Sequence, residues 1–265
     1  RQGDPGRTKF FVSLEDDLMK NWGPDWIQDT YHDYDVDERI GATKPLTKRK
    51  YKNLVERAQN ASESSGQASR RMTLEFAESM NIQRDIIYKE RDRLIKQEGR
   101  LDEIVEQVVR EVFVRVAKNK DYIEPIAFYR YILDNVSYQV DPQTAHQSFR
   151  SKKTKANFLW EIAQRELEAK YEILGTDEVI AQFQRMAILK AIDENWVEQV
   201  DYLQQLRAAL SGQYASQKNP LVEFFQEAYQ SFERMKALSK EQMVRNLLLS
   251  RVEINKKGEI VLHFP

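Results

Sequence analysis

Apolar residues recur every three or four positions over most of this chain, which is the spacing of one face of an α-helix. Five stretches show this pattern: residues 51–58, 72–94, 101–116, 177–210 and 221–238. Between the third and fourth, residues 120–175 carry shorter helical segments that are separated by Pro125, Asp141-Pro142 and Gly175. The sequence therefore predicts a mainly α-helical fold.

The last two helical stretches predict an antiparallel hairpin. One apolar stripe comprises Val179, Phe183, Met186, Leu189, Ile192, Trp196, Val200, Leu203, Leu206 and Leu210. A second comprises Leu221, Phe225, Ala228, Phe232, Met235 and Leu238. Two complementary stripes joined by the polar loop 211–220 favour helices that pack against each other. We expect one long upstream helix to cross this hairpin.

The pattern changes near both ends and in one internal stretch. Residues 9–13 predict a strand, followed by a short acidic helix from Leu14. Alternating apolar residues over 252–264, with a turn in the middle, predict a β-hairpin. Residues 60–69 are rich in Ser, Asn and Gly and have poor helix propensity, and we predict a kink or an irregular turn over residues 62–69, in or before the long helix. The fold class is thus mainly α, with minor β at both termini.

Composition limits the classes of partner. The 265 residues include 41 Lys and Arg and 42 Asp and Glu, so the formal net charge is −1. This balance gives no long-range field for nucleic acid, and we expect no nucleic-acid partner. There is no cysteine, and hence no disulfide framework or thiol nucleophile. No run of about 18 apolar residues occurs, so no membrane-spanning helix is expected.

Neither a metal site nor a self-contained catalytic site is predicted. The acidic triplet at residues 15–17 lies where a helix is expected to begin, and acidic residues there interact favourably with the helix dipole. His32, His146 and His263 lack the spacing of metal ligands. No Ser/His/Asp motif is recognisable. We therefore expect no metal in this chain, and a soluble enzyme with its own site is disfavoured.

The first residues, Arg1-Gln2-Gly3-Asp4-Pro5-Gly6, form a polar Gly/Pro-rich segment that runs into Phe10-Phe11-Val12-Ser13-Leu14-Glu15-Asp16-Asp17-Leu18-Met19. This combination resembles the last motor motif of the SecA protein-translocation ATPases. Further matches to that family follow in the same order: Gln83-Arg84 with Ile86-Ile87-Tyr88, Leu189 with Asp193 and Trp196, Leu206-Arg207, and Asn219-Pro220-Leu221. Residues 96–175 match only weakly.

The resemblance implies five segments. They are the C-terminal end of the second nucleotide-binding motor domain (1–44), the long helix of a helical scaffold (45–95), a helical wing domain (96–175), the two-helix finger of the scaffold (176–248) and a C-terminal β strand or hairpin (249–265). The upstream motor domains are expected to lie outside this sequence, which contains no Walker A motif. The chain alone is then expected neither to bind ATP tightly nor to hydrolyse it.

The resemblance also assigns nucleotide contacts. Arg1 falls on the arginine finger of the motif and Asp4 on its nucleotide-contacting aspartate, in a parent protein that uses ATP with Mg. An arginine near a γ-phosphate neutralises charge that develops during transfer. From composition alone, the same residues are interpreted as a frayed, charged terminus, and only the resemblance favours the nucleotide contacts.

A second expected site is the loop between the two helices of the predicted hairpin. In the family this hairpin is the two-helix finger, whose tip contacts the moving polypeptide. Gln213, Tyr214 and Gln217 are therefore expected to contact the exported polypeptide or the mouth of the channel. The plain alternative is that residues 211–220 only connect two helices.

The resemblance implies an ATP-driven motor that moves preproteins through a Sec-type channel, in the cytoplasm and peripherally on the cytoplasmic face of the membrane. Some positions depart from the usual family pattern: Gln199 replaces a His, Ala208-Ala209 replaces Gln-Gly, and no Cys-rich zinc-binding tail is present. These departures favour an accessory SecA of a Gram-positive bacterium, and truncation is the alternative explanation of the missing tail. The alternative, a helical adaptor that binds partner proteins, explains the helices but not the first motif.

Overall fold

Helix α3, Arg49–Lys96, contributes residues to both of the units into which the chain divides, 1–75 and 76–265. The computed structural model describes residues 3, 5–7, 11–27, 49–147, 151–211, 220–255 and 260–265. Among these residues, no helix is long and apolar enough to cross a membrane.

The first unit has a small apolar cluster between α1, Asp17–Trp22, and the beginning of α3. Its buried members are Met19, Ile27, Leu54 and Ala58. Short apolar side chains that are partly buried complete it: Val12, Leu14, Leu18 and Val55. This cluster holds the acidic helix against α3 within the unit.

The strand predicted over residues 9–13 is not formed in its described part, residues 11–13. A strand needs a neighbour for its backbone hydrogen bonds, and here the chain turns instead. The Ser13 N–H donates to Asp16 Oδ2 at 2.9 Å, and the Asp16 N–H donates to the Ser13 carbonyl at 3.2 Å. The helix consequently begins at Asp17 rather than at Leu14, and its first turn is acidic, as predicted.

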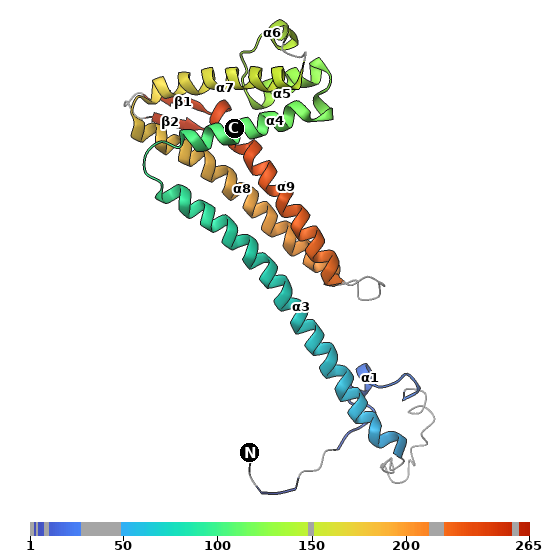
Figure 1. Ribbon diagram of the computed structural model, residues 1–265. Helices are drawn as coiled ribbons and strands as arrows, with labels where there is room; N and C mark the ends of the chain where they lie inside the picture. Colours follow the sequence, from blue (N-terminus) through green and yellow to red (C-terminus); the bar gives the residue numbers. More distant parts are fainter. Residues whose placement is uncertain are drawn as a thin grey trace. The chain divides into compact units, whose positions relative to one another are not determined.

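The second unit contains the predicted hairpin. Helix α8, Asp177–Ser211, and helix α9, Pro220–Leu249, lie side by side and run antiparallel (Figure 1). From Phe76 onward, α3 lies along this hairpin, where the rings of Phe76 and Phe224 pack edge to face with centroids 4.4 Å apart. The predicted combination of a long helix and a hairpin is confirmed.

A group of shorter elements packs at one end of the hairpin (Figure 1). They are α4 (Asp102–Lys118), a 3₁₀ helix (Lys120–Tyr122), α5 (Pro125–Asn135), α6 (Pro142–Gln147) and α7 (Lys152–Leu174). Helices α4 and α7 pack against each other, and both contact α9. Asp141 precedes α6 as the predicted turn residue, and its carboxylate accepts from the Thr144 N–H at 2.9 Å, which lowers its pKa.

The predicted C-terminal β-hairpin is confirmed. Strands β1, Arg251–Ile254, and β2, Ile260–His263, pair antiparallel, with Val252 opposite Leu262. Beyond β2, the ring of Phe264 stacks on that of Phe183 in α8, with centroids 6.3 Å apart and an interplanar angle of 5°. This contact joins the C-terminal segment to the base of the hairpin.

One continuous apolar core holds the second unit together. Its fully buried members come from α4, α5, α7, α8 and α9 and include Val109, Val112, Phe128, Ile132, Leu159, Phe183, Val244 and Leu247. The predicted stripes are wrong at three positions, because Met186, Phe225 and Leu238 are 42–47% exposed. Helix α8 instead buries Ala187 and Ala191, since α7 and α9 both contact it and cover more than one of its sides.

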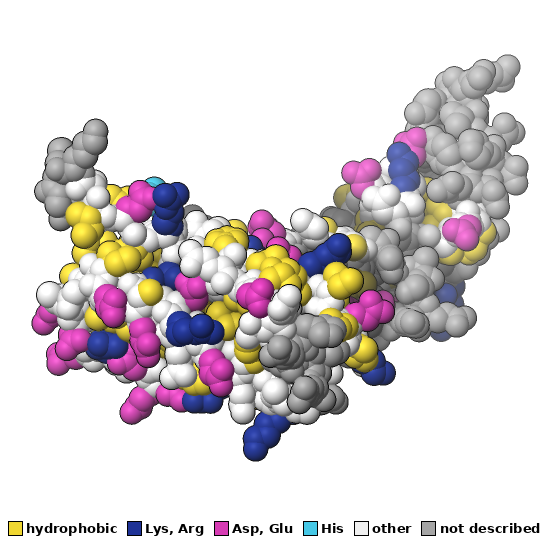
Figure 2. All heavy atoms as spheres, turned by 90° about the horizontal axis from the view of Figure 1, so that it is seen from above, with side chains coloured by type: hydrophobic (Ala, Val, Ile, Leu, Met, Phe, Trp, Pro, Cys, Tyr) yellow, Lys and Arg dark blue, Asp and Glu magenta, His cyan; other side chains and the backbone are white. Residues whose placement is uncertain are grey.

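Figure 2 shows one face of the molecule, on which Lys and Arg side chains lie among Asp and Glu side chains with hydrophobic groups between them. This mixture agrees with the formal net charge of −1.

Helix α3 is continuous through residues 60–69, so the kink or irregular turn predicted over residues 62–69 is wrong. The stretch contains no proline, and each unfavourable residue costs only about 1 kcal/mol or less relative to alanine. Extending an existing helix costs much less free energy than nucleating a new one. The helical turns on both sides of the segment therefore keep it helical.

Gly66, in the middle of this stretch, allows a test. A Cβ added there would approach Arg70 Nη1 at 3.2 Å, the end of a flexible side chain that can move. Gly66→Ala is expected to raise the free energy of unfolding by about 0.5–1 kcal/mol, because alanine loses less backbone entropy in a helix. Urea-induced unfolding followed by circular dichroism measures the change.

Gly175→Ala is the matched control and should have the opposite sign. Gly175 ends α7 with a φ of +78°, a conformation that side-chain-bearing residues adopt only with strain. A stabilising effect of both substitutions, or of neither, would contradict this account of α3.

Candidate functional site

The residues expected to contact nucleotide or polypeptide lie outside the described residues: Arg1, Asp4, Gln213, Tyr214 and Gln217. The structure does describe what holds the loop between the hairpin helices. Helix α8 ends at Ser211 and α9 begins at Pro220. The two helices pack against each other, and both contact α3 from Phe76 onward. The candidate site is therefore this hairpin together with the contacts that fix it.

Three helices meet at a set of buried polar side chains, which we call the polar node: Gln83 of α3, Gln199 of α8 and Ser231 of α9. Gln199 Nε2 donates to Gln83 Oε1 at 3.0 Å and to Ser231 Oγ at 2.9 Å. Gln83 Nε2 and Ser231 Oγ both donate to the Ala228 carbonyl, at 2.9 and 3.1 Å. Gln83, Gln199 and Ser231 are each at most 6% exposed.

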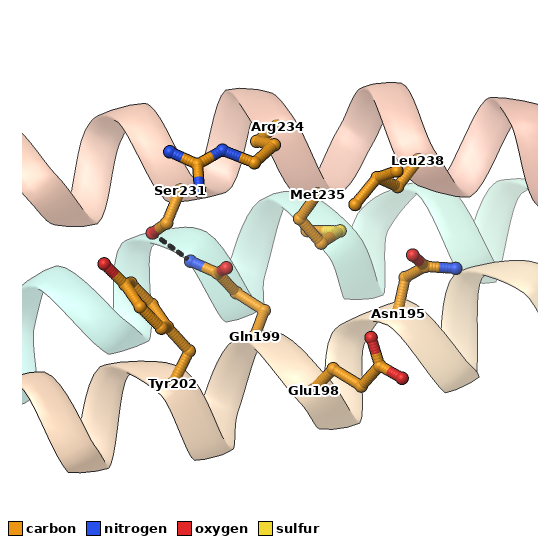
Figure 3. Close-up of a pocket in the computed structure, with 8 residues that line it drawn as sticks. All are labelled: Asn195, Glu198, Gln199, Tyr202, Ser231, Arg234, Met235 and Leu238. Atoms are coloured by element: carbon orange, nitrogen blue, oxygen red, sulfur yellow. Dashed lines mark hydrogen bonds between the residues drawn. The ribbon is translucent and has the colours of Figure 1, made fainter.

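A cavity of about 150 Å³ opens next to the polar node, between α8 and α9 (Figure 3). It is lined by Asn195, Glu198, Gln199, Tyr202, Ser231, Arg234, Met235 and Leu238. Figure 3 shows α3 passing behind the two helices, so the cavity lies on the side of the hairpin away from α3. Most of the residues that line it carry a polar or charged group.

A larger cleft of about 700 Å³ adjoins this cavity. The two share Asn195, Glu198 and Leu238, and the cleft extends to Asn135 at the end of α5. A groove thus follows the outer side of the hairpin toward the shorter helices.

Most of the acidic groups along the cleft are paired. Asp193 contacts Arg91 Nε at 2.6 Å, and Glu241 contacts Arg115 at 2.9 Å. Glu194 pairs with Lys190 one turn earlier in α8. Across the described part of the chain, no group of three or more His, Cys, Asp or Glu side chains could hold a metal ion. The ion pairs to Arg91 and Arg115 are suited to holding helices in place.

Gln184 of α8 connects the hairpin to the shorter helices, and it is fully buried. Its Oε1 accepts from the Leu101 N–H at 2.7 Å, next to the start of α4. Its Nε2 donates to Asp102 Oδ1 and to the Tyr171 hydroxyl, each at 2.7 Å. Burial raises the pKa of Tyr171. One side chain therefore joins α4, α7 and α8.

The next residue of α8, Arg185, joins the hairpin to the end of α3. Its guanidinium donates to the carbonyl of Leu94 at 3.1 Å and to that of Gln97 at 2.7 Å. The last carbonyls of a helix lack partners within it and carry partial negative charge, so a cation there is favourable. This contact fixes the C-terminal end of α3 to α8.

A buried lysine makes the corresponding contact at the end of α9. Lys170 of α7 donates to the Leu248 carbonyl at 2.7 Å and lies 3.5 Å from Glu166 Oε2. Burial lowers the pKa of Lys170, and the nearby Glu166 carboxylate opposes that shift. Ser137, just beyond α5, donates to the other oxygen of Glu166. The end of the hairpin is thus joined to α5 and α7.

Comparison with known protein families covers nearly all of the chain. The SecA wing and scaffold domain matches residues 45–251, and the SecA P-loop domain matches residues 1–39.

The chain belongs to the SecA family.

The SecA relatives include proteins called protein translocase subunit SecA 2. Those of Streptococcus gordonii and Streptococcus sanguinis are 49% and 51% identical to the chain, and that of Staphylococcus aureus strain Newman is 33% identical. Each match covers 100% of this chain and 33% of the relative. The chain therefore spans about a third of the length of the curated relatives it matches. The resemblance predicted from the motifs is confirmed.

The polar node of this SecA segment was not predicted from the sequence. The signal that could have revealed it is a polar residue at an apolar stripe position. Gln83 lies one turn before Ile87, and Gln199 lies between Trp196 and Leu203 at the same spacing. Such positions face a helical core, where a glutamine needs hydrogen-bond partners.

Proposed function

We propose that this chain is part of an ATP-driven SecA motor that moves preproteins across the cytoplasmic membrane, and that it couples the motor to the contact with the polypeptide. The SecA wing and scaffold match over residues 45–251 carries this proposal. The hairpin held along α3 supports it, because packed helices with fixed contacts move as one body and transmit a displacement.

The proposal divides the chain as the family does. Residues 1–44 belong to the second motor domain, 45–95 to the long scaffold helix, 96–175 to the wing, 176–248 to the two-helix finger and 249–265 to the C-terminal β segment. The contacts of Gln184 and Lys170 support a wing that is fixed to the base of the finger. Because α3 contributes to both units of the chain, it is the element through which we expect coupling.

The nucleotide is ATP with Mg, bound mainly by motor domains that this chain does not supply. In this proposal Arg1 is the arginine finger and Asp4 contacts the nucleotide. An arginine in that role stabilises charge that develops on the transferred phosphoryl group. The match of residues 1–39 to the SecA P-loop domain supports this assignment, which a helical adaptor without motor activity does not explain.

The partners we propose are an exported preprotein, contacted by Gln213, Tyr214 and Gln217, and a Sec-type channel. The protein then works in the cytoplasm and peripherally on the cytoplasmic face of the membrane. The relatives named SecA 2, from streptococci and staphylococci, support an accessory export pathway of a Gram-positive bacterium.

ATP turnover tests this function. The 265-residue chain alone is expected to release no phosphate above background, whereas a protein of the relatives' full length should hydrolyse ATP faster when preprotein is added. In that longer protein, Arg1→Ala should lower kcat by about 10³-fold or more, the usual cost of losing an arginine finger.

Arg7→Ala is the matched control, since Arg7 is an exposed arginine of the same segment, and its turnover should stay within about twofold of the wild type. Hydrolysis by the chain alone, or full turnover by the Arg1→Ala protein, would refute the proposed role.

A further inference from the structure

We propose that the polar node sets the register of α3 against the finger hairpin, and that Gln199 is its central positioning residue. This inference rests on the proposed motor function, in which a displacement of α3 has to reach the finger. Without a fixed register, part of that displacement would be lost as sliding between helices.

Apolar contacts alone do not fix a register strongly. Hydrophobic burial is non-directional, so helices packed through aliphatic side chains lose little when one shifts along the other. Hydrogen bonds are directional and weaken steeply beyond about 3.5 Å. Two bonds of the node join α3 to the hairpin, from Gln83 Nε2 to the Ala228 carbonyl at 2.9 Å and from Gln199 Nε2 to Gln83 Oε1 at 3.0 Å, so a slip of α3 by about 1 Å would strain both.

The burial of the node makes such a slip costly. Gln83, Gln199 and Ser231 are each at least 94% buried, so bonds broken by a slip are not readily replaced by water. Single buried polar residues are known to specify the register of packed helices in coiled coils, at some cost in stability. The node has the same chemistry, with neutral groups that pH does not change.

Other polar contacts of this part of α3 join it to one helix of the hairpin, whereas the node joins it to both. Arg91 pairs with Asp193, and Arg185 donates to the last carbonyls of α3, so both contacts join α3 to α8. The node joins α3 to α8 and also to α9, through Ser231 and the Ala228 carbonyl. Gln199 is the central residue of the node because its side-chain amide donates to both Gln83 and Ser231.

Two variants separate register from stability. Gln199→Met removes the central donor and leaves Gln83 Oε1 without it, so the midpoint of thermal unfolding should fall by about 2–6 °C. The triple variant Q83M/Q199M/S231A replaces the whole node by apolar groups of similar shape, and its midpoint should return to within about 2 °C of the wild type. Gln205→Met, an exposed position of α8, is the control.

The register is measured directly with spin labels at Lys89 of α3 and Glu233 of α9, both exposed. The chain has no cysteine, so Lys89→Cys and Glu233→Cys introduce the two attachment sites. The wild-type node and the Gln205→Met control should give one narrow distance distribution. The triple variant should give a broader distribution, with label-to-label distances that differ from the wild-type distance by up to about 5.4 Å, the rise of one helical turn. An equally narrow distribution in the triple variant overturns the proposal.

The consequence for coupling is measured as preprotein exported per ATP hydrolysed by a protein of full length. The triple variant should keep basal hydrolysis within about twofold while export per ATP falls at least about fivefold, an uncoupling that a loss of stability would not produce. Unchanged export per ATP overturns the proposal. Absence of export by the wild type would instead refute the proposed motor function, and the spin-label distances would still decide whether the node sets the register.

Discussion

Gln184→Met is expected to lower the free energy of unfolding by about 2–4 kcal/mol, because it removes three hydrogen bonds of one fully buried side chain at once. Methionine has nearly the same length and shape as glutamine, so the change leaves no large cavity. It does leave the buried Leu101 N–H without its acceptor and the Tyr171 hydroxyl without its donor. Asp102 is less affected, since it also contacts Arg100 Nε at 2.8 Å.

Urea-induced unfolding, followed by circular dichroism, measures this loss. Gln182→Met is the matched control, because Gln182 lies two positions earlier in α8 and is exposed. It should change the free energy of unfolding by no more than about 0.5 kcal/mol. Similar values for the two variants would show that the connection through Gln184 contributes little to the stability of the unit.

The fold follows from the sequence where the periodicity is long. The hairpin of α8 and α9 is marked by two apolar stripes, and the C-terminal β-hairpin by alternating apolar residues on either side of a turn. The kink or irregular turn predicted over residues 62–69 does not form, because low helix propensity is a weak effect beside the cooperativity of a long helix. Residues 9–13 were misread because a short apolar run becomes a strand only where a partner strand satisfies its backbone.

The interior of the candidate site could not be predicted in the same way. Gln83 bonds to a carbonyl 145 positions away, and Gln184 to a backbone N–H 83 positions away. Local patterns contain no information on such partners. Stripes also fail where a helix is covered on several sides, which is why Phe224 is buried while its neighbour Phe225 is 42% exposed. Family motifs assign roles to residues 1–6 and 211–220, but they do not reveal the contacts that hold the hairpin.

In a protein of the relatives' full length, Tyr214→Ala is expected to reduce preprotein export about tenfold while leaving folding intact. Tyr214 belongs to the polar segment between the end of α8 at Ser211 and the start of α9 at Pro220. Loops held by rigid elements often carry function. A tyrosine offers an aromatic surface with one hydroxyl, which can contact many polypeptide sequences without selecting one. That is the property needed at the tip of a finger that acts on an unfolded chain.

The matched control is Tyr229→Ala, which removes a tyrosine that is 66% exposed on α9 of the same hairpin. Tyr229→Ala should unfold within about 0.5 kcal/mol of the wild type, as surface substitutions usually do, and the proposed role of Tyr214 in contacting the polypeptide predicts the same for Tyr214→Ala. Only Tyr214→Ala should then lose export, measured with a preprotein and energised membrane vesicles at equal protein concentration. Export that is unchanged, or that falls in step with thermal stability, would support a plain connector between two helices, and the polypeptide contact would have to be sought along the groove beside Asn195 and Glu198.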